Sequence, residues 1–254
     1  MDAFDLKGRV AVVTGGNGGI GLGMARGLAA AGAAVVVAGR NRDKSLKAVR
    51  ELEALGARAL AVEVDVTDEA SVEGLIRRTV EGLGRVDILV NNAGTNIRKQ
   101  PEQYSLAEWR TVLDTNLTSA FLASRAAHPL MKAQGGGKII NIGSMMSIFG
   151  ASFTAPYAAS KGGIVQLTKA LATAWARDHI QVNAVLPGWI DTDLTADARR
   201  QIPGLHENVL RRTPEHRWGA PEDLAGIAVF LASPASDFLT GTAIPVDGGY
   251  SIQG

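Results

Sequence analysis

Short runs of β-branched and apolar residues recur along the chain, and longer stretches with helical spacing separate them. Apolar runs without polar alternation are typical of strands that are buried on both faces. The expected strands are Val10–Val13, Val35–Ala38, Ala59–Val64, Val86–Val90, Lys138–Ile142, Ile180–Val185 and Ala243–Val246. The expected helices are Gly21–Ala31, Asp43–Leu55, Asp68–Gly82, Ser105–Lys132, Ala155–Ala176 and Pro221–Ala232.

This alternation of strand and helix predicts an α/β fold, because each right-handed crossover between parallel strands needs a helix. Helices then cover both faces of a doubly wound, Rossmann-type parallel sheet. No Pro/Ser-rich linker or charge run divides the sequence, so we expect residues 1–254 to form a single dinucleotide-binding and catalytic domain. Residues 192–218 contain Pro203 and Pro214 and lack a clear period. We expect an irregular substrate lid there.

Composition points to a small-molecule substrate. The chain carries 26 Lys+Arg against 25 Asp+Glu, for a net charge of about +1, so it lacks the basic excess expected for nucleic acid or an anionic membrane. It has no cysteine, and its four His show no metal-ligand spacing, so no metal is expected. No apolar run reaches the roughly 18 residues of a membrane span, and no signal-peptide pattern opens the sequence. We expect a cytoplasmic protein.

A glycine-rich turn, Thr14–Gly21, joins the first expected strand to the first expected helix. Glycine allows a tight turn and lets the backbone approach a pyrophosphate, whose charge the helix N-terminus then stabilises. A glycine-rich turn alone serves many purposes, but its place between this strand and this helix predicts a dinucleotide site.

The end of the second expected strand bears on the choice of coenzyme. An acidic residue there would bind the ribose hydroxyls of NAD, whereas this chain has Gly39, followed by Arg40 and Arg42. Guanidinium groups are suited to pair with the 2′-phosphate of NADP. We therefore expect NADP, with NAD as the alternative. Asp65, at the end of the third strand, is placed to accept a hydrogen bond from the adenine amino group.

Tyr157 and Lys161 are the candidate acid–base pair. Residues four apart on a helix share a face, so both side chains should point into one site. A nearby ammonium favours the phenolate and would lower the pKa of the tyrosine toward neutrality. Ser144 follows the expected strand Lys138–Ile142, and its hydroxyl is placed to hold a carbonyl oxygen.

With these residues in order, the chain resembles the short-chain dehydrogenase/reductase family along nearly its whole length. The matching motifs are Thr14-Gly15-x-x-x-Gly19-x-Gly21, Asp65-Val66, Asn91-Asn92-Ala93-Gly94, Asp114-Thr115-Asn116-Leu117, Ser144, Tyr157-x-x-x-Lys161 and Pro187-Gly188. The resemblance implies a catalytic tetrad. In it, Asn116 holds the helix geometry and a relay water, Ser144 orients the substrate, Tyr157 transfers the proton, and Lys161 lowers the tyrosine pKa and binds the nicotinamide ribose.

The resemblance also implies coenzyme contacts and a homotetramer. Relatives commonly assemble through two long helices and the C-terminal strand region, here Ser105–Lys132, Ala155–Ala176 and Gly241–Gly254. NADP-using relatives often place a basic residue inside the glycine loop, where this chain has Asn17. The expected coenzyme contacts are Gly15, Asn17, Gly19, Ile20, Gly21, Arg40, Asp65, Val66, Asn92, Gly94, Tyr157, Lys161, Pro187, Gly188, Ile190 and Thr192.

Three local features are similar to the gluconate 5-dehydrogenase and 2-deoxygluconate 3-dehydrogenase branch of the family: Ser144–Ser147, Gly94–Arg98 and Arg217–Leu224. The expected reaction is hydride transfer between NAD(P) and a secondary alcohol or ketone, with a sugar acid or polyol as substrate. Arg98 is the interesting residue, because a guanidinium can bind a sugar-acid carboxylate in a bidentate manner. The expected substrate contacts are Arg98, Ser144, Met146, Tyr157 and Trp189.

Two alternatives stay open from the sequence. The first is a reductase of a bulkier ketone, such as a 3-oxoacyl thioester or a cyclic ketone, with Trp189, Ile148 and Phe149 as apolar walls. The second is a coenzyme-binding protein without turnover. The intact tetrad argues against the second alternative: Asn116, Ser144, Tyr157 and Lys161.

Overall fold

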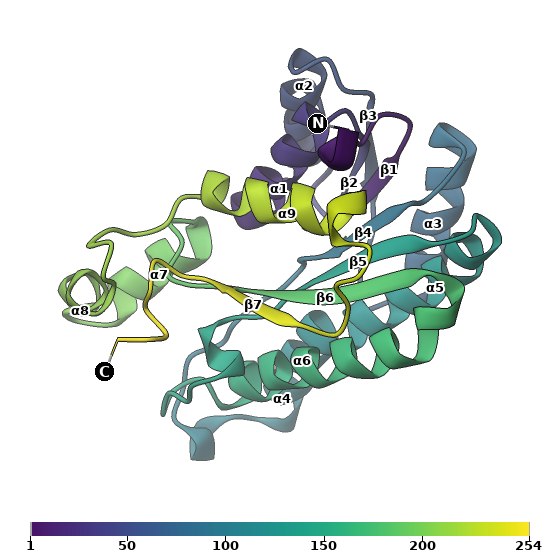
Figure 1. The fold of residues 1–254 in the computed structure, drawn as a ribbon. Helices are drawn as coiled ribbons and strands as arrows, with labels where there is room; N and C mark the ends of the chain where they lie inside the picture. The colour runs from purple at the N-terminus through teal and green to yellow at the C-terminus, as the bar shows by residue number, and fades with distance from the viewer. Residues whose placement is uncertain (1, 254) are drawn as a thin grey trace.

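The computed structural model describes residues 2–253, which contain one seven-stranded, fully parallel sheet (Figure 1). The strand order is β3-β2-β1-β4-β5-β6-β7. The strands are β1 (Val10–Thr14), β2 (Ala34–Gly39), β3 (Ala59–Glu63), β4 (Ile88–Asn91), β5 (Gly137–Ile142), β6 (Ile180–Pro187) and β7 (Ala243–Val246). The order reverses between β1 and β4, and such a reversal opens a ligand crevice at the carboxyl ends of the strands.

Helices pack on both faces of the sheet, as expected. In β1, Ala11 and Val13 pack against α1, α2 and α9, whereas Val10 and Val12 pack toward α3, α5 and α6. Alternate side chains of the strand thus enter two separate cores, which explains the unbroken apolar runs. The helices are α1 (Gly19–Ala30), α2 (Arg42–Ala54), α3 (Glu69–Leu83), α4 (Leu106–Leu113), α5 (Ser119–Ala133), α6 (Ala155–Trp175), α7 (Asp193–Gln201), α8 (Leu205–Arg212) and α9 (Ala225–Ala232).

Local side chains fix several helix starts. The Asn41 side chain accepts a hydrogen bond from the Lys44 amide at the start of α2. Ser105 and Glu108 form a reciprocal capping box at the start of α4. The Asn41 cap lies in the turn between β2 and α2, which borders the cavity at the carboxyl end of the sheet.

The segment expected to be helical over Ser105–Lys132 is helical from Leu106 to Ala133, with a π-helical turn, Asp114–Thr118, between α4 and α5. A π turn inserts one extra residue into the helical ladder and rotates the side chains around it. The helical segment was therefore expected correctly, but periodicity in a single sequence does not reveal so local an insertion as the π turn.

The expectation of an irregular segment at 192–218 was also wrong. The segment contains α7 and α8, which extend beyond the carboxyl end of the sheet (Figure 1). Ala198, Leu205 and Val209 form a small core of their own, against which Trp189 and Trp218 pack. Both helices are short and amphipathic, with Leu205 and Val209 of α8 buried four residues apart, so the expectation overlooked a local helical pattern. Within the described residues, no helix is long and apolar enough to cross a membrane.

Candidate active site

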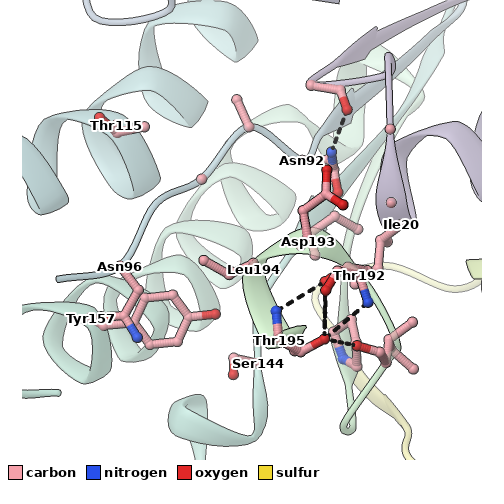
Figure 2. A pocket seen from close by; sticks show the side chains of 18 of the residues that line it. Ile20, Asn92, Asn96, Thr115, Ser144, Tyr157, Thr192, Asp193, Leu194 and Thr195 are labelled. Carbon is pink, nitrogen blue, oxygen red and sulfur yellow. Dashed lines mark hydrogen bonds between the residues drawn. The ribbon is translucent and has the colours of Figure 1, made fainter. Parts of the chain in front are cut away.

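A cavity of about 520 Å3 lies along the carboxyl ends of the strands. It runs from the glycine turn and the ends of β2 and β3 to the segment after β5 and the first turn of α7. Figure 2 shows Ile20 and Asn92 on one side of the cavity, and Ser144, Tyr157 and Asn96 on the other. The topology therefore brings the expected coenzyme and substrate residues together.

The glycine turn leaves room for a ligand where side chains would close it. Gly15 and Gly19 adopt φ values of +64° and +50°, which favour glycine. A Cβ on Gly21 would lie 2.4 Å from Gly15 O and 2.4 Å from Asn92 Nδ2. Asn92 Nδ2 donates to Thr14 O and Gly15 O at 3.0 and 3.2 Å. The turn is thus held in shape from β4, and its geometry fits the pyrophosphate of a dinucleotide.

Polar groups surround the far end of the cavity. Arg40 is exposed at the cavity wall, together with Asn41 and Lys44. Hydrogen bonds from the Thr67 amide and hydroxyl lower the pKa of Asp65, and the charge of Arg40 lowers it further. Asp65 therefore presents a carboxylate, as an acceptor for an adenine amino group requires.

The space at Gly39 is already filled. A Cβ there would lie only 2.7 Å from Asn17 Nδ2, which itself donates to Ser45 Oγ at 3.0 Å. An acidic side chain at Gly39 would therefore have to displace Asn17. Arg42 does not line the cavity, so of the two expected arginines only Arg40 reaches it.

The first turn of α7 closes over the glycine turn. Thr192 caps the helix, and its Cγ2 would contact a Cβ on Gly19 at 3.1 Å. Lys44 Nζ also lies 3.1 Å from Asp193 Oδ2, which joins α2 to α7 across the mouth of the cavity. In Figure 2, Thr192, Asp193 and Thr195 stand between the glycine turn and Tyr157.

Tyr157 and Lys161 share one face of α6, as the spacing predicts. Burial raises the pKa of Tyr157, an effect that the Ser144 hydroxyl and the Arg98 charge partly offset. Lys161 Nζ lies 5.6 Å from the Tyr157 ring centroid and donates to Ile142 O at 2.7 Å. We expected Lys161 to lower the pKa of Tyr157, but in this structure the pKa of Tyr157 is raised and Lys161 is not among its causes. Its ammonium points to the end of β5, and burial outweighs the neighbouring charges.

Burial also lowers the pKa of Lys161 to about 8. A lysine with its pKa there remains largely charged at neutral pH. Its hydrogen bond to the Ile142 carbonyl holds the head group at the centre of the cavity wall, where a ribose hydroxyl would find a donor.

Asn116 lies in the π turn and is buried. Its Oδ1 accepts from Thr95 N at 2.7 Å, and its Nδ2 donates to Thr95 O at 2.9 Å and to Ser160 Oγ at 3.0 Å. Ser160 precedes Lys161 on α6. Asn116 does not line the cavity; it ties the segment after β4 to α6 and so fixes the position of the lysine.

Arg98 reaches the substrate end of the cavity. Its Nη1 and Nη2 donate to Gln201 Oε1 and Leu194 O at 3.4 and 3.5 Å, both in α7. These bonds are long, so most of the donor capacity of the guanidinium remains for a ligand. Burial lowers the pKa of Arg98, and the neighbouring Tyr157 and Asp197 raise it.

The cavity contains most of the residues expected from the sequence. All expected coenzyme and substrate contacts line it except Gly21, which lies behind the turn; of the tetrad, only Asn116 lies outside. Ile148 and Phe149, the apolar walls of the bulky-ketone alternative, are also outside: Ile148 is exposed, and Phe149 packs edge-on against Tyr250. Sequence reasoning missed these cavity residues: Gly18, Asn41, Lys44, Thr67, Asn96, Thr115, Phe153, Thr154, Asp193, Leu194 and Thr195.

A turn shaped for a pyrophosphate and a half-buried tyrosine that shares its helix face with a buried lysine border this one cavity. That combination defines a class: oxidoreductases that work with a nicotinamide coenzyme. The comparisons with known proteins agree. A family model described as enoyl-(acyl carrier protein) reductase matches residues 15–251.

Two relatives and one solved structure show to which family the chain belongs. The 2-dehydro-3-deoxy-D-gluconate 5-dehydrogenase of Escherichia coli is 43% identical over 98% of both chains. The gluconate 5-dehydrogenase of Gluconobacter oxydans is 40% identical over 99% of this chain and 98% of its own length. A crystal structure of a gluconate 5-dehydrogenase from Burkholderia cenocepacia, in complex with NADP and tartrate, is 41% identical, with a TM-score of 0.94 over 99% of this chain and 98% of that one. The chain belongs to the short-chain dehydrogenase/reductase family and is an NAD(P)-dependent oxidoreductase.

Proposed function

We propose that this chain is an NADP-preferring dehydrogenase of sugar acids, which interconverts a secondary alcohol and a ketone. The observation that carries the proposal is the position of Arg98. Its guanidinium lies in the same cavity as Tyr157, close enough to influence the tyrosine pKa. A carboxylate bound there would leave another carbon of the same acid at the proton-transferring hydroxyl.

The chemistry divides among a few side chains. Bound NAD(P) supplies the hydride donor or acceptor. Tyr157 gives a proton to the ketone oxygen in reduction and accepts it from the alcohol in oxidation. Its raised pKa keeps the phenol protonated, which is the state that reduction needs. Ser144 holds the substrate oxygen, and Lys161 binds the coenzyme ribose.

The preference for NADP rests on the end of β2. Arg40 offers a positive charge to a 2′-phosphate, and Gly39 offers none to repel it. Lys44 adds a second cation at the same wall. Bound NADP in the Burkholderia relative supports this assignment.

The sugar-acid substrate rests on charge and on the relatives. A half-buried guanidinium with spare donors, such as that of Arg98, binds carboxylates more strongly than neutral hydroxyls. The relatives named above act on gluconate or a deoxygluconate derivative, and tartrate, a hydroxy acid, is bound in the Burkholderia structure. Trp189 and Met146 line the same end and supply apolar surface beside the carbon chain.

Three further features belong to the proposal. Residues 192–218 act as the substrate lid, since α7 borders the cavity and contacts Arg98. The working enzyme is a homotetramer, which the exposed apolar side chains of Trp109 and Phe121 on α4 and α5 support. It works in the cytoplasm.

The test is coenzyme reduction followed by absorbance, with NADP and NAD, over a matched set of alcohols. The set contains D-gluconate, D-sorbitol, which is a neutral polyol of the same length, and cyclohexanol. We expect the highest kcat/KM with D-gluconate and NADP. If cyclohexanol is preferred, or if sorbitol equals gluconate, the sugar-acid assignment is wrong.

A further inference from the structure

The Asn96 carboxamide is the starting point. Asn96 lines the substrate end of the cavity. Its Oδ1 is buried and is the one buried side-chain nitrogen or oxygen that has no hydrogen-bond partner among residues 2–253. Such a group costs free energy in a folded protein, because it has left water without gaining a partner. The oxygen does not face the cavity as it stands, but because no partner holds it, the carboxamide is free to turn about χ2 and present its oxygen or nitrogen to a ligand in the cavity.

The surrounding chain shows where along a substrate Asn96 acts. Two residues before it, a Cβ on Gly94 would lie 3.3 Å from Asn116 Oδ1 and 3.8 Å from Lys161 Nζ, next to the catalytic lysine. Two residues after it, Arg98 occupies the site proposed for the carboxylate. Asn96 thus lies midway along the segment that joins the reaction centre to the carboxylate site.

In Figure 2, Asn96 and Tyr157 are both on the side of the cavity away from Ile20, and both residues line the cavity. A carbon chain with one end on Arg98 and a reacting carbon at Tyr157 would pass this carboxamide.

A role in holding the loop does not explain the residue. The neighbouring segment is held by other groups: Asn116 bonds both backbone groups of Thr95, and the Tyr104 hydroxyl donates to Ile97 O at 2.6 Å. The Asn96 oxygen contributes to neither contact. A leucine of nearly the same volume would fill the space without an unsatisfied oxygen.

We propose that Asn96 binds a hydroxyl on the carbon chain between the carboxylate and the reacting carbon. A carboxamide suits this task, because its oxygen accepts from a hydroxyl, its nitrogen donates to one, and rotation about χ2 exchanges the two. The substrate is then a polyhydroxy acid, and Asn96 selects it over acids that lack this hydroxyl. The inference rests on the proposed function, whose substrate class it makes more specific.

The test is a double-mutant-type cycle, in which one change is made in the protein and the other removes one hydroxyl from the substrate. The kcat/KM of the wild type and of Asn96→Leu is measured with D-gluconate and with its 2-deoxy, 3-deoxy and 4-deoxy forms. For D-gluconate we expect a loss of about three- to tenfold in Asn96→Leu, mainly through KM, the size of one hydrogen bond. For one of the deoxy acids the loss should vanish, because the wild type has already lost the same contact.

Controls separate this role from a structural one. Gln100→Leu removes an exposed carboxamide from the same segment, outside the cavity, and should leave kcat/KM unchanged. Asn96→Ala replaces the leucine variant if the melting temperature shows that leucine disturbs the fold. If the Asn96 variants lose the same factor with every acid, or lose nothing, the inference is wrong although the proposed function stands.

Sorbitol and its deoxy forms separate a failure of the sugar-acid proposal from a failure of the Asn96 proposal. If the wild type oxidises sorbitol but no acid, the sugar-acid proposal falls. The same cycle on sorbitol and its deoxy forms then decides whether Asn96 binds a hydroxyl. If the wild type oxidises neither acids nor polyols, both proposals fall together.

Discussion

The two ends of the cavity are built in different ways. At the coenzyme end, backbone groups form most of the surface that would meet a phosphate. Glycines with positive φ shape this turn, and Asn92, which directly follows β4, holds it in place. At the end proposed to bind the substrate, side chains form the surface: Arg98 after β4, Ser144 after β5 and Trp189 after β6. Backbone recognition tolerates few replacements, whereas single side chains can be exchanged. The difference explains how one scaffold keeps its coenzyme while relatives change substrate.

The largest expected effect falls where the two ends meet. Tyr157→Phe keeps the ring in place and removes the proton that is transferred, so kcat should fall by about 10²–10⁴-fold. Coenzyme binding, measured by fluorescence titration, should stay close to wild type because the glycine turn is untouched. A variant that retained more than a tenth of the wild-type rate would show that another group transfers the proton.

Tyr250→Phe is the matched control for this prediction. It removes the same hydroxyl from a tyrosine outside the cavity, which accepts a hydrogen bond from Arg212 at 3.3 Å. Its activity should remain near the wild-type level, whereas that of Tyr157→Phe should not.

The second prediction tests the backbone end. Gly21→Ala places a Cβ 2.4 Å from both Gly15 O and Asn92 Nδ2, so the turn must shift. We expect a loss of about 1–3 kcal/mol in the free energy of unfolding, together with weaker coenzyme binding. Gly162→Ala, in the middle of α6, meets nothing within 4 Å and should stabilise the protein by up to about 1 kcal/mol. Equal effects of the two variants in denaturant titration would contradict the close packing of the turn.

The same contrast explains what could be predicted from the sequence. The parallel sheet with helices on both faces follows from apolar runs that alternate with helices, and the coenzyme turn follows from glycines at fixed offsets. Tyr157 and Lys161 follow from helical spacing. These signals are local, because each depends on neighbours within a few positions in the chain.

The remaining features depend on distant contacts. Lys44 meets Asp193 across the cavity mouth, and Arg98 meets α7, although nothing local links either pair. The raised pKa of Tyr157 depends on burial by several segments, which spacing does not report. Asn96 was missed because an unsatisfied amide is recognised only when its surroundings are known.

The third prediction tests the side-chain end. Arg98→Ala should lower kcat/KM for D-gluconate by roughly 10–100-fold, mostly through KM, because the contact is remote from the reacting carbon. Sorbitol should be affected much less. Arg98→Lys keeps the charge but loses the planar pair of donors, so its loss should be intermediate. Equal losses for the acid and the polyol would show that Arg98 supports the lid through Leu194 and Gln201 and does not bind the substrate.

The smallest expected effect concerns Arg40, an exposed side chain at the coenzyme end of the cavity. Its guanidinium lies at the cavity wall beside Gly39, where Asn17 already fills the space that an acidic side chain would need. Arg40→Asp should therefore shift the ratio of the NADP and NAD affinities about tenfold in favour of NAD. The shift should be no larger, because water screens an exposed ion pair. Arg42→Asp makes the same change in net charge two residues away, outside the cavity, and should shift the ratio far less.

Both coenzymes are titrated into each variant at two salt concentrations. Salt strongly screens the long-range field of the protein's net charge but weakens a direct contact with the 2′-phosphate less, so the two contributions can be separated. Identical shifts in the two variants, or NAD binding as tight as NADP in the unmodified protein, would show that the end of β2 does not select the coenzyme.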